Sequence, residues 1–95
     1  MSEEQEIQAI MDEYPKVKAA VYFMEKTRRG VPDFWANVLK HNTKPQEVAA
    51  MLFGALGASA LTEKDEKKKK MLEMAVEQSM LPEFLVYVKA CMGSV

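Results

Sequence analysis

The chain has 95 residues, of which 48% are hydrophobic and 28% are charged. This composition is typical of one folded globular domain, so we expect a single domain over residues 1–95 and not a disordered segment. Thirteen basic and fourteen acidic side chains leave a formal net charge of −1. The chain therefore has no overall field that would attract nucleic acid or an anionic membrane, and we expect neither as a partner.

Three further features indicate a cytoplasmic protein. Cys91 is the single cysteine, which excludes an internal disulfide and a cysteine-based zinc cluster and fits a reducing compartment. The first residues are acidic and polar, unlike the basic and then apolar start of a signal peptide. The longest nearly uncharged stretch, residues 48–61, is shorter than the roughly 20 residues of a spanning helix. We expect no membrane insertion.

Good helix formers dominate every segment, and β-branched residues are few. The sequence therefore predicts an all-α fold, a compact antiparallel bundle of four to five helices. Apolar residues at spacings of three and four predict a first helix from about residue 3 to residue 28. Pro15 lies inside this segment. We expect a kink or break over residues 12–15, because proline removes a helical hydrogen bond and clashes with the preceding turn.

Prolines and polar residues delimit the later helices, which we expect over residues 32–41, 44–59, 63–79 and 82–92. Thr43 and Thr62 precede two of them and are the expected N-terminal caps. Gly93 is the expected left-handed C-terminal cap of the last helix. The charged run over residues 63–70 predicts a solvated helix face with ion pairs four residues apart, namely Glu63–Lys67, Asp65–Lys69 and Glu66–Lys70.

No pattern typical of an active site, a cofactor site or a metal site is present. The glycines at 54 and 57 are not followed by the Lys-Ser or Lys-Thr of a phosphate loop. His41, the single histidine, has no carboxylate or nucleophile beside it in the sequence, and a position near a helix C-terminus accounts for it. Cys91 is interpreted as a small core side chain. We expect no enzyme, with a reaction using His41 or Cys91 as the remaining alternative.

A strip of small residues marks the third predicted helix. Ala50, Gly54 and Ala58 recur at intervals of four residues and lie on one helix face. Gly54 costs about 1 kcal/mol relative to alanine in a helix interior, so a close contact should compensate. The sequence favours packing against the core, and leaves open a contact with a partner helix or with a second copy of the chain.

Large flexible and aromatic side chains are the other candidates for contact. Seven methionines follow Met1, at positions 11, 24, 51, 71, 74, 80 and 92. Methionine fills irregular gaps in cores, but it also lines adaptable surfaces that accept partner helices. Met71 and Met74 are our candidates for such a surface. Trp35, beside Phe34, is ordinarily a core anchor and is also an interaction candidate.

Several short motifs are similar to one known family. Glu13-Tyr14-Pro15-Lys16, Val21-Tyr22, Val31-Pro32-Asp33-Phe34-Trp35 and Lys40-His41-Asn42 resemble nucleosome assembly proteins of the SET type, where the long dimerisation helix runs into the globular domain. Leu61-Thr62-Glu63-Lys64-Asp65-Glu66 resembles the acidic helix start that follows. The resemblance implies that Val31, Pro32, Phe34 and Trp35 pack the domain against the long helix. The histone-binding β-sheet and the acidic tail of that family have no counterpart, so histone binding does not carry over.

These observations predict a non-enzymatic helical protein–protein interaction module. Its partner would be another protein or a second copy, and a dimer would form through the amphipathic face of residues 7–24. The candidate contact residues on that face are Ile10, Tyr14, Val17 and Val21. The alternative is a small dedicated chaperone, adaptor or immunity protein that holds a partner helix in a methionine-rich groove.

Overall fold

The computed structural model describes residues 3–93, which fold into six α-helices and one 3₁₀ turn. Their bounds are α1 Glu3–Glu13, the 3₁₀ turn η1 Pro15–Val17, α2 Lys18–Gly30, α3 Phe34–Leu39, α4 Pro45–Thr62, α5 Glu66–Ser79 and α6 Pro82–Gly93. No strand occurs among the described residues. The predicted all-α class is confirmed, and the break at Pro15 accounts for one helix more than the five expected.

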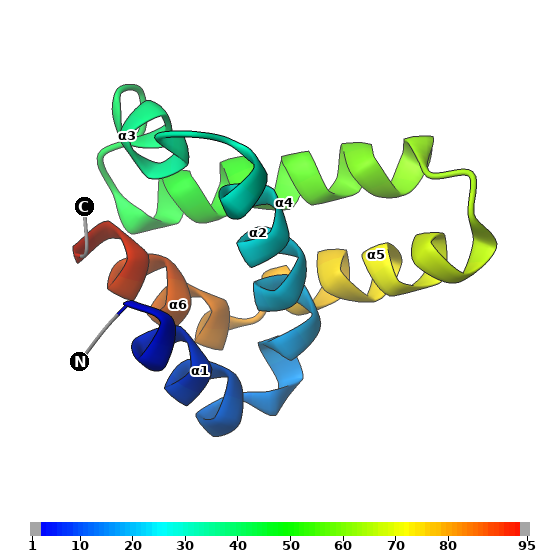
Figure 1. The fold of residues 1–95 in the computed structure, drawn as a ribbon, viewed down its shortest axis with the longest axis horizontal. Coiled ribbons are helices and arrows are strands. Elements are labelled where there is room, and N and C mark those ends of the chain that lie inside the picture. The colour runs from blue at the N-terminus through cyan, green and yellow to red at the C-terminus, as the bar shows by residue number, and fades with distance from the viewer. Residues whose placement is uncertain (1–2, 94–95) are drawn as a thin grey trace.

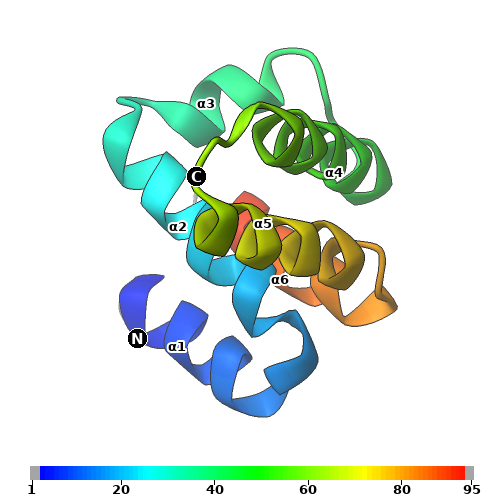
Figure 2. The same cartoon turned by 90° about the vertical axis from the view of Figure 1, so that its right-hand side faces the viewer.

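The helices form a bundle built on an antiparallel hairpin of α4 and α5, which projects from the body (Figure 1). Helix α2 runs across α5 on the side away from α4, and α6 packs against α4 and α1. Figure 2 shows α5 between α4 and α2, with α1 below them. The short α3 lies beside the upper end of α2 and contacts α6. The described residues fill an envelope of 36 × 29 × 23 Å.

Pro15 breaks the first predicted helix as expected. Helix α1 ends at Glu13, the Tyr14 N–H donates to the Ile10 carbonyl at 2.8 Å, and Pro15 opens the 3₁₀ turn. Proline fits there because the first position of a helical turn needs no donor. The chain changes direction at this turn (Figure 1). As a result, the apolar residues of α1 and α2 face the same core.

Neither predicted threonine cap is formed. Lys44 precedes α4 without a side-chain cap bond, so the Thr43 prediction is wrong. Thr62 still belongs to α4, and its hydroxyl donates to the Ala58 carbonyl at 3.1 Å. The cap of α5 is Asp65, whose carboxylate accepts from the Lys67 backbone N–H at 3.0 Å. The third helix continues three residues further than expected because its apolar pattern extends through Leu61.

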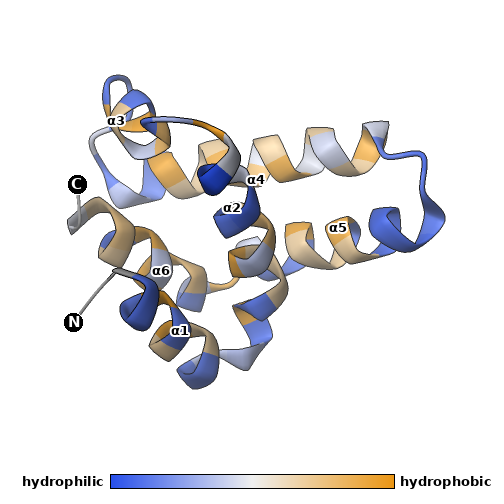
Figure 3. Cartoon of the chain, in the orientation of Figure 1, coloured by the Kyte–Doolittle hydropathy of each residue, from blue (hydrophilic) through white to orange (hydrophobic). Residues whose placement is uncertain are grey.

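The shift of this boundary also removes the predicted ion pairs. Helix α5 begins at Glu66, so Glu63 and Asp65 lie before the helix. None of the three pairs expected over residues 63–70 is formed within the part of the chain that the structure describes. The run is a solvated surface at the tip of the hairpin, drawn in blue in Figure 3.

Two turns depart from the expected backbone. Gly93 is the last residue of α6, and no glycine within residues 3–93 has a positive φ, so the predicted left-handed cap is wrong. Asp33 takes the left-handed conformation instead, with φ of 55°, just before α3. Aspartate tolerates this region better than most residues. It therefore acts as the turn residue, and α3 begins at Phe34 and not at Pro32.

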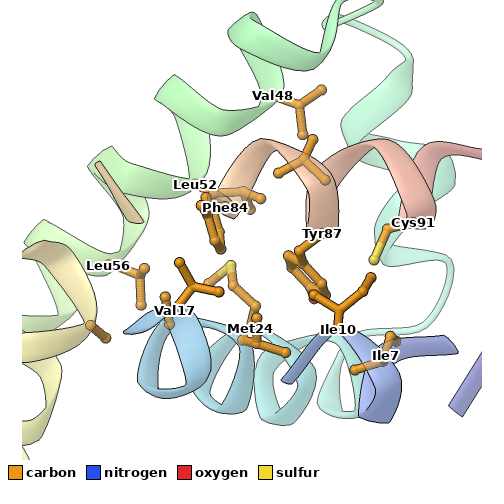
Figure 4. Close-up of a cluster of buried hydrophobic side chains, with 14 of the residues drawn as sticks. Ile7, Ile10, Val17, Met24, Val48, Leu52, Leu56, Phe84, Tyr87 and Cys91 are labelled. Carbon is orange, nitrogen blue, oxygen red and sulfur yellow. The ribbon is translucent and has the colours of Figure 1, made fainter. Parts of the chain in front are cut away.

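The core combines side chains from every α-helix, and Figure 4 labels members of it from α1, η1, α2, α4 and α6. Phe84 and Tyr87 of α6 are its largest fully buried members, with their ring centroids 5.5 Å apart. Val17, Val21 and Leu52 are buried against the same centre. Helix α6 contacts α1, α2, α3 and α4, and it contributes the two largest fully buried side chains of the core.

A polar contact joins α2 to α6 inside this core. The Tyr87 hydroxyl donates to Glu25 Oε1 at 2.8 Å. The Arg28 guanidinium donates from Nε and Nη2 to Glu25 Oε2 at 3.0 and 2.9 Å. Both oxygens of the buried carboxylate thus have partners, as burial of a charged group requires. Burial raises the pKa of Tyr87 far above its ordinary value, and the nearby Cys91 and Glu25 raise this pKa further.

Candidate functional site

The amphipathic face of residues 7–24 is covered within one chain. Ile10, Val17 and Val21 are buried in the core, and Tyr14 is half-buried against it. The turn at Pro15 directs both halves of the segment toward α5 and α6. A dimer contact through these residues, as the sequence suggested, would require the monomer core to open.

Trp35 is also part of the core, with its ring centroid 6.4 Å from that of Tyr87. Its indole N–H is buried and has no hydrogen-bond partner within residues 3–93. Val31 and Pro32 are exposed, so the expectation that they pack against the first helix is wrong. The chain leaves α2 at Gly30 and turns at Asp33, which directs the Trp35 ring, but not the two preceding residues, toward α6.

The small-residue strip of α4 faces solvent. Ala50, Gly54 and Ala58 are exposed, and a Cβ atom added at Gly54 would meet nothing within 4 Å. Core packing by this strip, the interpretation that the sequence favoured, is wrong. The opposite face, with Leu52 and Leu56, packs against the core. Helix α4 is apolar on nearly all sides (Figure 3), so periodicity gave no basis for choosing between its faces.

Replacing Gly54 with alanine is therefore expected to raise the free energy of unfolding by about 0.5–1 kcal/mol, because alanine is the better helix former and nothing obstructs its Cβ. Urea denaturation followed by circular dichroism measures the change. Gly57 has the same open surroundings, and Gly57→Ala is the matched comparison. A loss of stability in Gly54→Ala alone would mean that another surface packs against this residue.

Met71 and Met74 lie on the surface of α5, with 42% and 52% of their area exposed. They border an apolar groove between α5 on one side and α1, η1 and α2 on the other. The groove has a volume of about 450 Å³. Its lining residues are Met11, Pro15, Lys16, Lys18, Ala19, Tyr22, Phe23, Met71, Met74 and Gln78.

Helical spacing explains how α5 serves both the core and the groove. Leu72, Ala75 and Ser79 are buried on one face, whereas Met71, Met74 and Gln78 follow at intervals of three and four on the adjacent face. The contact between α2 and α5 brings Tyr22 and Phe23 opposite these methionines. One helix therefore forms a wall of the groove and also part of the core.

The aromatic pair on α2 fixes the other wall. The rings of Tyr22 and Phe23 meet edge to face with centroids 5.4 Å apart. The Lys26 ammonium lies 5.1 Å from the Tyr22 centroid, close enough for a cation–π contact. Phe23 is half-buried and Tyr22 is 43% exposed. This wall is thus aromatic, whereas the wall facing it is formed by the flexible side chains of methionine.

Lysines are the charged residues that line the groove. Lys16 and Lys18 come from η1 and the start of α2, and both side chains are exposed. No aspartate or glutamate is among the lining residues. The nearby Asp12 accepts a hydrogen bond from the Gln8 amide at 3.0 Å. The groove is therefore an apolar surface with a basic border.

The candidates for chemistry are placed apart from the groove. His41 is exposed on the turn after α3, and Cys91 is buried in α6. Among residues 3–93 no group of three or more His, Cys, Asp or Glu side chains could hold a metal ion. No helix in this range is both long and apolar enough to cross a membrane.

Comparison with known proteins adds no relative. The chain matches no protein-family model, no curated protein and no solved structure. The resemblance to nucleosome assembly proteins stays a prediction.

Sequence reasoning found the methionine wall but missed the rest of the groove. Met71 and Met74 were predicted contact residues, whereas Tyr22, Phe23 and Lys18 were not. The spacing of Lys18, Tyr22 and Phe23 on α2 could have indicated that they share a helix face. The packing of α2 across α5 is what places this face of α2 opposite the methionines.

Proposed function

We propose that this protein is a non-enzymatic interaction module that holds a helix of a partner protein in the groove between α2 and α5. The exposed methionines facing an aromatic wall carry the proposal. Met71 and Met74 leave about half of their area in water, although covering apolar surface gains roughly 25 cal/mol per Å². A partner that covers this surface would therefore gain free energy from its burial.

The residue types support a helix as the occupant. Methionine side chains adjust to the shape of what they contact, which is why they line surfaces that accept amphipathic helices. The α5 wall runs from Met71 to Gln78, about 10 Å at the 1.5 Å rise of a helix, and the 3₁₀ turn at Pro15 borders the groove opposite it. A helix lying along α5 would contact both walls.

The single buried cysteine supports a further part of the proposal, a reducing intracellular compartment as the place of work. A dedicated chaperone, an adaptor and an immunity protein would all use a groove of this kind. The identity of the partner protein distinguishes among the three.

The test is selection of helical peptides that bind the full chain from a displayed library of amphipathic helices. With ¹³C-methyl methionine labelling, a groove-directed peptide is expected to shift the Met71 and Met74 methyl signals. Met71→Glu and Met74→Glu should each weaken binding by tenfold or more, because they place a charge in the apolar contact. The matched control is Met80→Glu, at an exposed methionine after α5 that does not line the groove.

Two results would overturn the proposal. One is a selection that yields no peptide with a methyl shift at Met71 or Met74. The other is a set of peptides that bind Met74→Glu and Met80→Glu equally well. Sedimentation of the free chain measures its oligomeric state in parallel. If the chain forms a dimer through the groove, the occupant is a second copy of the chain and not a partner helix.

A further inference from the structure

We infer that the helix held in the groove carries aspartate and glutamate along the borders of its apolar ridge. The inference rests on the proposed function and specifies the chemistry of the partner. It depends on the charges around the groove and on the lack of ion-pair partners for these charges among residues 3–93.

The basic border extends beyond the lining residues. Lys16 and Lys18 line the groove at the end formed by η1 and α2. Lys67 lies four residues before Met71 on α5, so it is one helical turn away on the face that carries Met71, Met74 and Gln78. The lysines that line the groove thus lie at its η1 and α2 end, and Lys67 lies one turn beyond the α5 lining. An occupant helix along α5 would run between them.

These ammonium groups have no ion-pair partner among the described residues. The ion pairs formed by described residues join Arg28 to Glu25 and Arg29 to Glu4, away from the groove lysines. No carboxylate within residues 3–93 forms an ion pair with Lys16, Lys18 or Lys67. Asp12 and Glu13, the carboxylates that precede η1, do not line the groove. The charges that line the groove are therefore those of Lys16 and Lys18. Lys67 and the exposed carboxylates Glu73 and Glu77 of α5 lie outside the lining.

Complementarity then defines the occupant. Residues 67–78 of α5 extend over about 17 Å, or three helical turns. A matching helix presents apolar side chains at i, i+4 and i+7 to the methionines and the aromatic wall. Acids that flank this ridge would reach Lys67 on one side and Lys16 and Lys18 on the other. Basic flanks would meet like charges, so charge selects against them.

Exposed ion pairs contribute little individually and are screened by salt. The expected signature is therefore a preference that depends on ionic strength. A groove-binding peptide with glutamate flanks is expected to bind at least tenfold more tightly than its Glu→Gln analogue at 20 mM NaCl, and less than threefold more tightly at 500 mM. Peptides from the library selection should be enriched in acids at the flanking positions.

A lysine variant tests whether the groove border causes the preference. In Lys16→Gln/Lys18→Gln/Lys67→Gln the acidic peptide and its Gln analogue should bind with affinities within threefold of each other, while the analogue keeps its wild-type affinity. The control is Lys40→Gln/Lys44→Gln/Lys89→Gln, which changes the net charge equally at exposed lysines outside the groove lining. Isothermal titration calorimetry of the full chain measures all these affinities.

The outcomes separate the two proposals. Peptides that shift the Met71 and Met74 methyls without acid enrichment or salt dependence would overturn the acidic partner and leave the docking groove standing. Absence of any groove-directed peptide would overturn both. Dodecanoate that displaced the acidic peptide from the groove at concentrations below the Kd of that peptide would assign the basic border to a fatty-acid carboxylate and would also overturn the inference.

Discussion

Replacing Phe84 with alanine is expected to lower the free energy of unfolding by about 3–5 kcal/mol. The Phe84 ring is fully buried at the centre of the bundle, where it lies beside the tilted ring of Tyr87 and is surrounded by residues of α2 and α4 (Figure 4). Its removal loses the burial of the ring and leaves a cavity that the neighbouring helices fill only in part. A domain of this size has a total stability of roughly 5–14 kcal/mol, so the variant should be close to unfolding.

Urea denaturation followed by circular dichroism measures this effect. At a slope of about 1.5 kcal/mol per M, the midpoint should fall by roughly 2–3 M. The control is Met80→Ala, because Met80 is 70% exposed and its truncation should change stability by less than about 0.5 kcal/mol. Equal effects of the two substitutions would mean that α6 does not hold the centre of the core.

The helical architecture follows from the sequence where one physical signal dominates. Pro15 ends α1 whatever surrounds it, because the missing N–H and the ring act locally. The apolar spacing through Ile10, Val17 and Val21 marks buried residues correctly. The sequence could not decide between a dimer face and an internal core face, because spacing shows that a face is covered but not by which chain. The 3₁₀ turn sets the direction of α2, and because of this direction α5 and α6 cover the apolar face of residues 7–24.

Helix α4 shows the opposite case. Its outward residues Ala50, Gly54 and Ala58 are nearly as apolar as its buried ones, so the sequence carries no contrast between the two faces. The same lack of contrast hid the end of the helix, since Leu61 and Thr62 continue the pattern past the expected boundary. Leu61 is 81% exposed. Tertiary packing, and not periodicity, assigned the faces of this helix.

The sequence predicts only one of the two walls of the groove, the methionine wall of α5. Methionine on an exposed helix face indicates an adaptable surface, and this placed Met71 and Met74 correctly at the surface. Tyr22 and Lys18 belong to a segment distant in the sequence, and they reach the methionines through the crossing of α2 over α5. A site built from two elements that meet in space has no signature in either element alone.

The stability of the protein is expected to fall above pH 10 because of Tyr87. Burial, then the charges of Cys91 and Glu25, raise the pKa of this phenol in the folded chain. In the unfolded chain it titrates near the ordinary tyrosine value of about 10. Above that pH the unfolded state has lost a proton that the folded state keeps. The contribution of Tyr87 to the free energy of unfolding is therefore fully present below pH 10. Above pH 10 this contribution falls by about 1.4 kcal/mol per pH unit.

Tyr87→Phe should reveal this dependence by removing it. At pH 7 the variant is expected to be less stable by roughly 1.5–3 kcal/mol, because Glu25 Oε1 loses the hydroxyl that donates to it at 2.8 Å. Above pH 10 phenylalanine has no proton to lose, so the wild type should lose stability faster than the variant. The two curves should converge and meet between about pH 11 and pH 12. Urea denaturation at intervals from pH 7 to pH 11.5 measures both curves, and a constant difference throughout would show that the Tyr87 phenol ionises equally well in the folded and unfolded chains.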